Sequence, residues 1–79
     1  MFFTYILKSQ VNNDIYVGST ENVENRLEKH NSGKVRSTKA YRPWKMISIE
    51  EFSSRSEAFK REHFLKTGQQ KELLRKKYC

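Results

Sequence analysis

Large apolar and aromatic side chains recur at every second position from residue 3 onward. A period of two in β-forming residues predicts a strand over about residues 3–9. The run 11–14 is rich in turn-forming residues, and residues 15–17 predict a short second strand that ends at Gly18. The first 18 residues are therefore expected to form a β-hairpin.

The spacing becomes helical after the hairpin. Val23 and Leu27 lie four residues apart, as the buried face of a helix requires. Thr20 is expected to cap the N-terminus of this helix, and Gly33 is expected to end it in the left-handed conformation that glycine tolerates. Residues 31–43 then predict an irregular loop.

Residues 44–52 combine aromatic and β-branched side chains and predict a third strand. Strict alternation along this strand would place Ser48 on the same face as Trp44. It would also place Ile49 together with Ile47 on the opposite face.

The last third of the chain predicts two helices. Residues 54–57 read Ser-Arg-Ser-Glu, which is the capping-box pattern, so a helix is expected over about residues 55–66. Gly68 is expected to stop it, and a short basic helix is expected over about residues 69–77. The predicted element order is β-β-α-β-α-α, which indicates one α+β domain over residues 1–79.

The composition fits one folded domain. The chain has 79 residues, of which 35% are hydrophobic and 13% aromatic, and disordered chains are usually poor in aromatic residues. The single cysteine, Cys79, excludes an internal disulfide and a multi-cysteine metal site, and it is interpreted as an incidental thiol. The apolar N-terminus is shorter than the roughly 20 residues of a membrane span and lacks the basic segment of a signal peptide. We therefore expect a cytoplasmic protein with no membrane association.

The formal net charge of +7 points to an anionic partner. Residues 31–45 contain five cations and no anion, with hydroxyl and aromatic side chains between them. Cations neutralise phosphates, hydroxyls bond phosphate oxygens and aromatic rings stack on bases, so the pattern favours nucleic acid over a merely solvated basic surface. The cations expected to contact the nucleic acid are Lys34, Arg36, Lys39, Arg42 and, further along the chain, Lys66.

Glu62 interrupts the apolar face of the expected helix 55–66, because it shares a helical stripe with Ala58 and Leu65. A carboxylate in this position must be paired, ligate a cation or lie at the rim of a cleft. The structural alternative is a rim glutamate that is paired with a nearby lysine or arginine.

Four further side chains are candidates for chemistry. Arg26 and His30 lie one helical turn apart, and an arginine fork suits phosphate while histidine can exchange a proton near neutral pH. Tyr5 and Tyr16 can face one side of the hairpin. Taken separately, an arginine and a histidine on a helix are usually just surface residues. Two tyrosines on strands are more often part of core or edge packing than of a reaction.

Taken together, these residues resemble the motifs of the GIY-YIG nuclease domain, over about residues 3–66. The resemblance is strongest to small stand-alone bacterial members related to the N-terminal nuclease module of the excinuclease C subunit. The first motif keeps only its tyrosine, and Ser19 stands where excinuclease relatives carry a lysine. The matching positions are Tyr5, then Tyr16-Val17-Gly18, then Arg26 and His30, and finally Glu62 in a helix of the pattern EA…E…LK.

The resemblance implies a three-stranded antiparallel sheet flanked by helices. It also implies hydrolysis of a DNA phosphodiester with one divalent metal ion, Mg²⁺ or Mn²⁺, whose only protein ligand would be Glu62. Arg26 would clamp the phosphate, and Tyr5 and Tyr16 would lie on the side of the attacking water. His30 would take a position that Tyr or His occupies in relatives, and the general base is left open between Tyr16 and His30.

The expected function is therefore a metal-dependent DNA endonuclease, nicking or structure-directed, with DNA repair as its setting. No reader module accompanies the five candidate residues, so targeting would come from the structure of the DNA or from a partner protein. The alternative is a nucleic-acid-binding module of the same fold that cleaves weakly or not at all. A basic domain for acidic protein partners would explain the charge but none of the five residues.

Overall fold

The computed structural model describes residues 1–78, so Cys79 lies outside the described residues. The predicted order β-β-α-β-α-α is confirmed. A short 3₁₀ helix, η1, which was not predicted, lies in the loop before the third strand. The elements are β1 (Phe2–Ser9), β2 (Ile15–Thr20), α1 (Val23–Asn31), η1 (Lys39–Tyr41), β3 (Trp44–Phe52), α2 (Arg55–Leu65) and α3 (Gly68–Tyr78).

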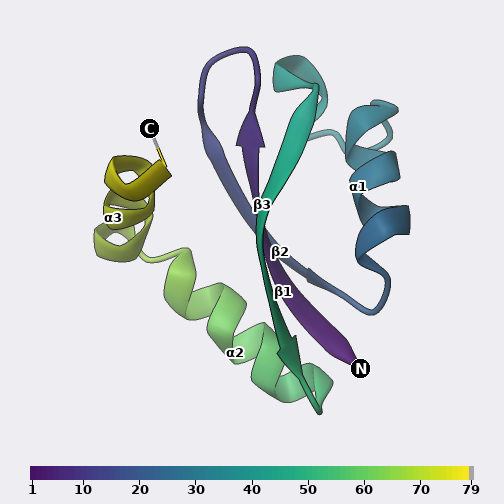
Figure 1. Ribbon diagram of the computed structural model, residues 1–79, viewed down its shortest axis with the longest axis vertical. Helices are drawn as coiled ribbons and strands as arrows, with labels where there is room; N and C mark the ends of the chain where they lie inside the picture. Colours follow the sequence, from purple (N-terminus) through teal and green to yellow (C-terminus); the bar gives the residue numbers. More distant parts are fainter. Residues whose placement is uncertain (79) are drawn as a thin grey trace.

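The strands form one antiparallel sheet in the order β2-β1-β3, so β1 is central and β2 and β3 are edges. The sheet lies between helices: α1 covers one face, and α2 and α3 cover the other (Figure 1). This arrangement confirms the α+β fold with a three-stranded antiparallel sheet flanked by helices. Within residues 1–78, no helix has the length and apolar character needed to cross a membrane.

Each face of the sheet has its own apolar core, because successive side chains of β1 point to opposite faces. Ile6 packs with Leu65 of α2 on one face. Tyr5 and Leu7 pack with Trp44 on the other face, where Leu27 of α1 contacts them. The alternation predicted for the first strand is thus the reason that one strand supports helices on both sides.

A β-bulge in β3 overturns part of the predicted alternation. The pairing with β1 slips by one residue, which leaves Ile47 without a partner opposite it. After the bulge, the even- and odd-numbered residues of β3 point to the opposite faces of the sheet from those before it. Ser48 therefore lies on the opposite face from Trp44, and Ile49 lies on the opposite face from Ile47. Both face predictions were wrong because the extra residue shifts the phase of the strand.

The helix caps agree with the sequence except at two positions, one before α1 and the other at Gly68, which begins α3 instead of ending α2, whose C-cap is Lys66. The N-cap of α1 is Asn22, whose side-chain oxygen accepts a hydrogen bond from the Asn25 backbone N–H at 3.0 Å. Thr20 was predicted for this role but is the last residue of β2, so the helix starts after it. Ser54 caps α2 as predicted, and Gly33 after α1 has the expected left-handed φ of 82°.

Candidate active site

Tyr5 and Tyr16 lie on the same face of the sheet, as the hairpin predicted, with ring centroids 6.4 Å apart. Tyr5 is directly opposite Gly18 on β2. A Cβ atom at Gly18 would overlap the hydroxyl end of the Tyr5 ring. The glycine of the Tyr-Val-Gly motif is therefore required for a close approach: it lets the Tyr5 ring lie across β2.

His30 is completely buried, with 0% of its surface exposed. Its Nε2 atom lies 3.0 Å from the Tyr5 hydroxyl, and its Nδ1 atom lies 2.8 Å from the Thr38 hydroxyl. The Thr38 hydroxyl in turn donates to the Val35 carbonyl, so it accepts from Nδ1–H. The hydrogen-bond pattern thus assigns a neutral imidazole that is protonated on Nδ1 and accepts a hydrogen bond from Tyr5.

The histidine therefore forms its hydrogen bond with Tyr5 and not with Tyr16. Tyr16 contacts the imidazole only through its ring, edge to face, with centroids 4.9 Å apart. Thr38 was missed because it lies in the basic loop, where its hydroxyl suggested phosphate contact rather than support of His30.

Burial determines the protonation states of this pair. It raises the pKa of Tyr5 to about 12, and together with the positive charge of Arg26 it lowers the pKa of His30 to about 4. Both groups are consequently neutral at pH 7, in agreement with the hydrogen-bond pattern.

This pKa shift predicts acid sensitivity of the fold. An unfolded chain binds a proton at His30 below pH 6.5, whereas the folded chain does so only near pH 4, so His30 destabilises the fold as pH falls through this window. The free energy of unfolding should fall by about 2 kcal/mol from pH 7 to pH 5 on account of this group alone. Urea unfolding at pH 5, 6 and 7 measures it.

His30→Gln should be less stable than wild type at pH 7 but should lose most of this pH dependence. His63→Gln removes an exposed histidine and serves as the control, which should keep the wild-type dependence. Equal slopes in wild type and His30→Gln would show that His30 is not the group responsible.

Arg26 lies one turn before His30 on α1 and is half-buried. Interaction with the phenol oxygen of Tyr5 raises the pKa of Arg26, and Tyr16 contributes a smaller effect in the same direction. The guanidinium therefore lies close to both phenol groups as a permanent positive charge.

Glu62 comes from α2, on the other side of the sheet, and reaches the open edge of β2. One carboxylate oxygen accepts a hydrogen bond from the Ser19 hydroxyl at 2.5 Å, and the other lies 2.7 Å from the Lys66 ammonium. Burial alone would raise the pKa of Glu62, but the hydrogen bonds from Lys66 and Ser19 lower it below its ordinary value. The carboxylate is therefore ionised, with a side chain that is 13% exposed.

Lys66 lies near residues from both faces of the sheet at the edge formed by β2. Its ammonium contacts Glu62 and also lies 5.6 Å from the centroid of the Tyr16 ring. The negative charge of Glu62 is near enough to raise the pKa of Tyr5. Lys66 was predicted as a cation for the nucleic-acid backbone, and its i, i+4 spacing from Glu62 was the signal for the ion pair.

The other predicted cations lie outside this cluster, on the loop between α1 and β3. Each is exposed, and none forms an ion pair with a carboxylate within the described part of the chain. Thr38 attaches the loop to His30, so the cations stand next to the C-terminal end of α1. They are Lys34, Arg36, Lys39 and Arg42.

The arrangement combines two cations, two phenol groups and one carboxylate around the edge of β2. Arg26 and Lys66 are positive, Glu62 is negative, and the Tyr5 and Tyr16 rings lie between them. A site of this kind can hold an anionic oxygen compound against the cations and still offer a carboxylate to a metal ion.

Comparison with known proteins identifies the fold family. The model of the GIY-YIG catalytic domain matches residues 1–78. A UPF0213 protein of Staphylococcus haemolyticus is 42% identical over 74 residues, which cover 92% of this chain and 89% of that protein. A UPF0213 protein of Staphylococcus aureus is 38% identical, with the same shares covered.

A solved structure shares the architecture. The solution NMR structure of a UPF0213 protein from Bacillus halodurans superposes with a TM-score of 0.55 at 32% identity, covering 94% of this chain and 82% of that one. The family model and the relatives confirm the resemblance to the GIY-YIG domain, and the solved structure agrees with the observed fold. This chain belongs to the GIY-YIG catalytic domain family and has its nuclease-type fold.

Proposed function

We propose that the protein is a metal-dependent DNA endonuclease that hydrolyses phosphodiester bonds at the edge of β2, by nicking or by recognising DNA structure, in DNA repair. The observation that carries this proposal is the ionised carboxylate of Glu62, held at a strand edge beside Lys66 and the Tyr16 ring. Its pairing with Lys66 matches the rim glutamate of the structural alternative, but a domain that only binds nucleic acid gains nothing from a carboxylate next to its phosphate site. The test is nicking of supercoiled plasmid in Mg²⁺ or Mn²⁺.

The donor set fits a divalent ion that relies on its substrate for further ligands. No group of three or more His, Cys, Asp or Glu side chains gathers among residues 1–78, so an ion at Glu62 would draw most of its ligands from the substrate and water. Mg²⁺ commonly uses one or two carboxylates plus substrate phosphates and retains several waters. The bound ion would supply Lewis-acid polarisation of the phosphate and stabilise the leaving oxygen.

Lys66 compensates for the serine at position 19. Relatives of the excinuclease type carry a lysine there, whereas here Ser19 orients Glu62 and the cation comes from the end of α2. The Lys66 side chain is 45% exposed, whereas the Glu62 side chain is only 13% exposed, so the ammonium can move into solvent while the carboxylate stays in place. Glu62 can therefore exchange Lys66 for a metal ion, which frees the ammonium for a phosphate oxygen.

Arg26 is assigned to the non-bridging oxygens of the phosphate, because its fork is already held beside two hydroxyls. Tyr16 is assigned to the attacking water. It lies on the edge strand, whereas His30 is buried with both ring nitrogens engaged. His30 is thus a positioning residue for Tyr5 rather than the group that contacts the water.

The unpaired cations of the basic loop are assigned to the DNA backbone. Reversing both Lys39 and Arg42 to glutamate should weaken binding to every DNA sequence alike, because phosphate contacts carry no base information. The logarithm of affinity should fall linearly with the logarithm of salt concentration, with a slope of about −0.9 per phosphate contacted. Fluorescence anisotropy between low and moderate salt measures the slope.

The neutral pair Lys39→Gln with Arg42→Gln is the matched control. It should reduce the steepness of the salt dependence by the two lost contacts, while its binding stays tighter than that of the charge-reversed variant. A salt response that is flat in the wild type would contradict DNA binding as a whole.

A further inference from the structure

A pocket of about 570 Å³ lies beside Glu62, outside the five candidate site residues. It is formed where the end of β2, the start of α1 and the first turns of α2 meet. Its volume falls in the range of small-molecule sites. The pocket is lined by Phe2, Ser19, Thr20, Glu21, Asn22, Asn25, Arg55, Ala58 and Phe59.

The lining combines aromatic rings with free amide groups. Phe2 from β1 and Phe59 from α2 contribute the rings, and the Phe59 side chain is 53% exposed. The Asn25 side chain and the amide N–H₂ of Asn22 have no hydrogen-bond partner among the described residues. A ring for stacking and an amide for donor and acceptor contacts are what recognition of an unstacked nucleobase requires.

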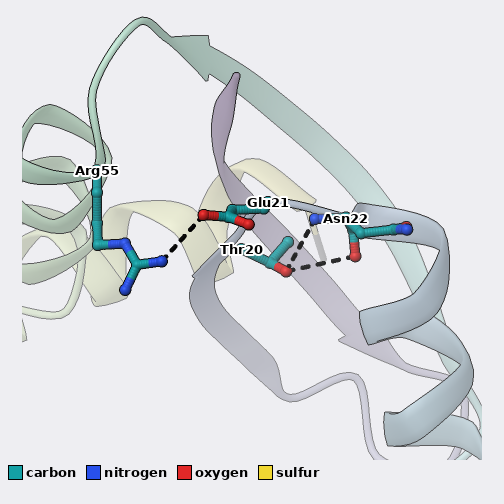
Figure 2. A network of polar contacts seen from close by, with 4 residues as sticks. All are labelled: Thr20, Glu21, Asn22 and Arg55. Carbon is teal, nitrogen blue, oxygen red and sulfur yellow. Dashed lines mark hydrogen bonds and ion pairs between the residues drawn. The ribbon is translucent and has the colours of Figure 1, made fainter.

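The charges of the pocket cancel. Arg55 reaches from α2 to Glu21 and forms an ion pair with it at 2.9 Å, next to the hydrogen bonds between Thr20 and Asn22 (Figure 2). With its one cation paired, the pocket does not favour a phosphate. The pair lies at the exposed rim and leaves the pocket without net charge.

The pocket is continuous with the candidate active site. Ser19 lines the pocket and also donates the hydrogen bond to Glu62. Asn22 lies one helical turn before Arg26 on the same stripe of α1. A nucleotide whose phosphate lies between Arg26 and Glu62 can therefore place its base among the pocket residues.

We propose that this pocket binds the unstacked nucleobase next to the scissile phosphate, with Phe59 as its stacking platform. The inference rests on the proposed endonuclease function and specifies its substrate. Bases in a continuous duplex are paired and stacked, and taking one out costs free energy. The pocket therefore selects single-stranded, flapped or distorted DNA over continuous duplex.

The test compares two phenylalanines of α2 in the full chain carrying Glu62→Gln, so that the DNA stays uncut. Phe59→Ala removes the ring from the pocket, whereas Phe64→Ala removes an equally exposed ring, 48% exposed, that does not line it. Anisotropy titrations use a single strand, a flap and a duplex of one sequence. Phe59→Ala should weaken binding of the first two by about 5- to 150-fold and leave the duplex unchanged.

Two further arms sharpen this comparison. Phe59→Trp keeps a stacking ring and should retain binding. A set of flaps in which each nucleotide in turn is abasic should show one position where affinity falls as much as in Phe59→Ala, and the two changes combined should cause no additional loss. Equal losses on duplex and flap, no loss at all, or an equal loss in Phe64→Ala would overturn the nucleobase pocket.

The outcome separates the two proposals. A wild-type chain that nicks plasmid and binds DNA in a salt-dependent manner, but is indifferent to Phe59 and to abasic positions, leaves the endonuclease intact and removes the nucleobase pocket. A wild-type chain that binds no DNA of any form removes both.

Discussion

Replacing Glu62 by glutamine is expected to lower plasmid nicking by at least about 10³-fold in both Mg²⁺ and Mn²⁺. The amide has nearly the shape of the carboxylate and can still accept the hydrogen bond from Ser19, so the fold should be retained. It cannot offer a negative oxygen to a divalent ion, and the Lewis-acid contribution of a metal is worth several kcal/mol in a transition state. DNA binding should persist or become tighter, because one negative charge next to the phosphate is gone.

Glu72→Gln is the matched control, since it removes an exposed carboxylate of α3 that forms no ion pair within residues 1–78. It should nick as fast as wild type. Binding of Mn²⁺ to the protein–DNA complex, followed by electron paramagnetic resonance, gives a readout that is independent of turnover and should be lost only in Glu62→Gln. Wild-type nicking by Glu62→Gln would show that the metal assignment is wrong.

Most of the fold could be predicted because the two-residue spacing of apolar side chains in strands and the four-residue spacing in helices occur in different segments of the chain. Alternation over β1, a four-residue spacing at Val23 and Leu27, and the capping box at Ser54 each determine one local structure. In a chain of 79 residues that buries one thin core on each face, these local preferences agree with the tertiary packing, and the element order follows.

The errors have a common physical origin in small shifts along the chain, by one residue at the bulge and by two at the helix cap. The bulge at Ile47 inverts the faces of Ser48 and Ile49, and alternation alone contains no sign of it. Thr20 and Asn22 are both good N-caps, and the choice between them is made by the length of the pairing between β1 and β2. Both outcomes depend on strand register, which is a tertiary property.

The candidate site was only partly visible in the sequence. Glu62 stood out because a carboxylate interrupts an apolar stripe, and its partner Lys66 lies at the expected helical spacing. The position of His30 did not stand out, because its burial and its bonds to Tyr5 and Thr38 are long-range contacts. Spacing along the chain singles out these candidates, while three-dimensional contacts distinguish a buried positioning group from one that can contact water.

Removing the guanidinium of Arg26 is expected to have the second large effect. Arg26→Ala should lower the single-turnover cleavage rate by about 10³- to 10⁵-fold, as loss of a transition-state arginine does in phosphoryl transfer. The guanidinium lies close to the hydroxyls of Tyr5 and Tyr16, and its fork can present paired donors to a phosphate. Arg26→Lys should recover little of this rate, because a point charge cannot reproduce two parallel hydrogen bonds.

The effect should lie in the rate and not in affinity, which distinguishes Arg26 from the basic loop. Arg36→Ala removes an exposed cation of that loop and should weaken DNA binding while leaving the single-turnover rate at saturating DNA near the wild-type value. Rates at saturating protein, combined with dissociation constants measured without metal, separate the two. If Arg26→Lys cleaved like wild type, or if Arg26→Ala lost only affinity, the residue would act as one more phosphate-binding cation. Lys66, the other cation at the edge of β2, would then be the candidate for stabilising the transition state.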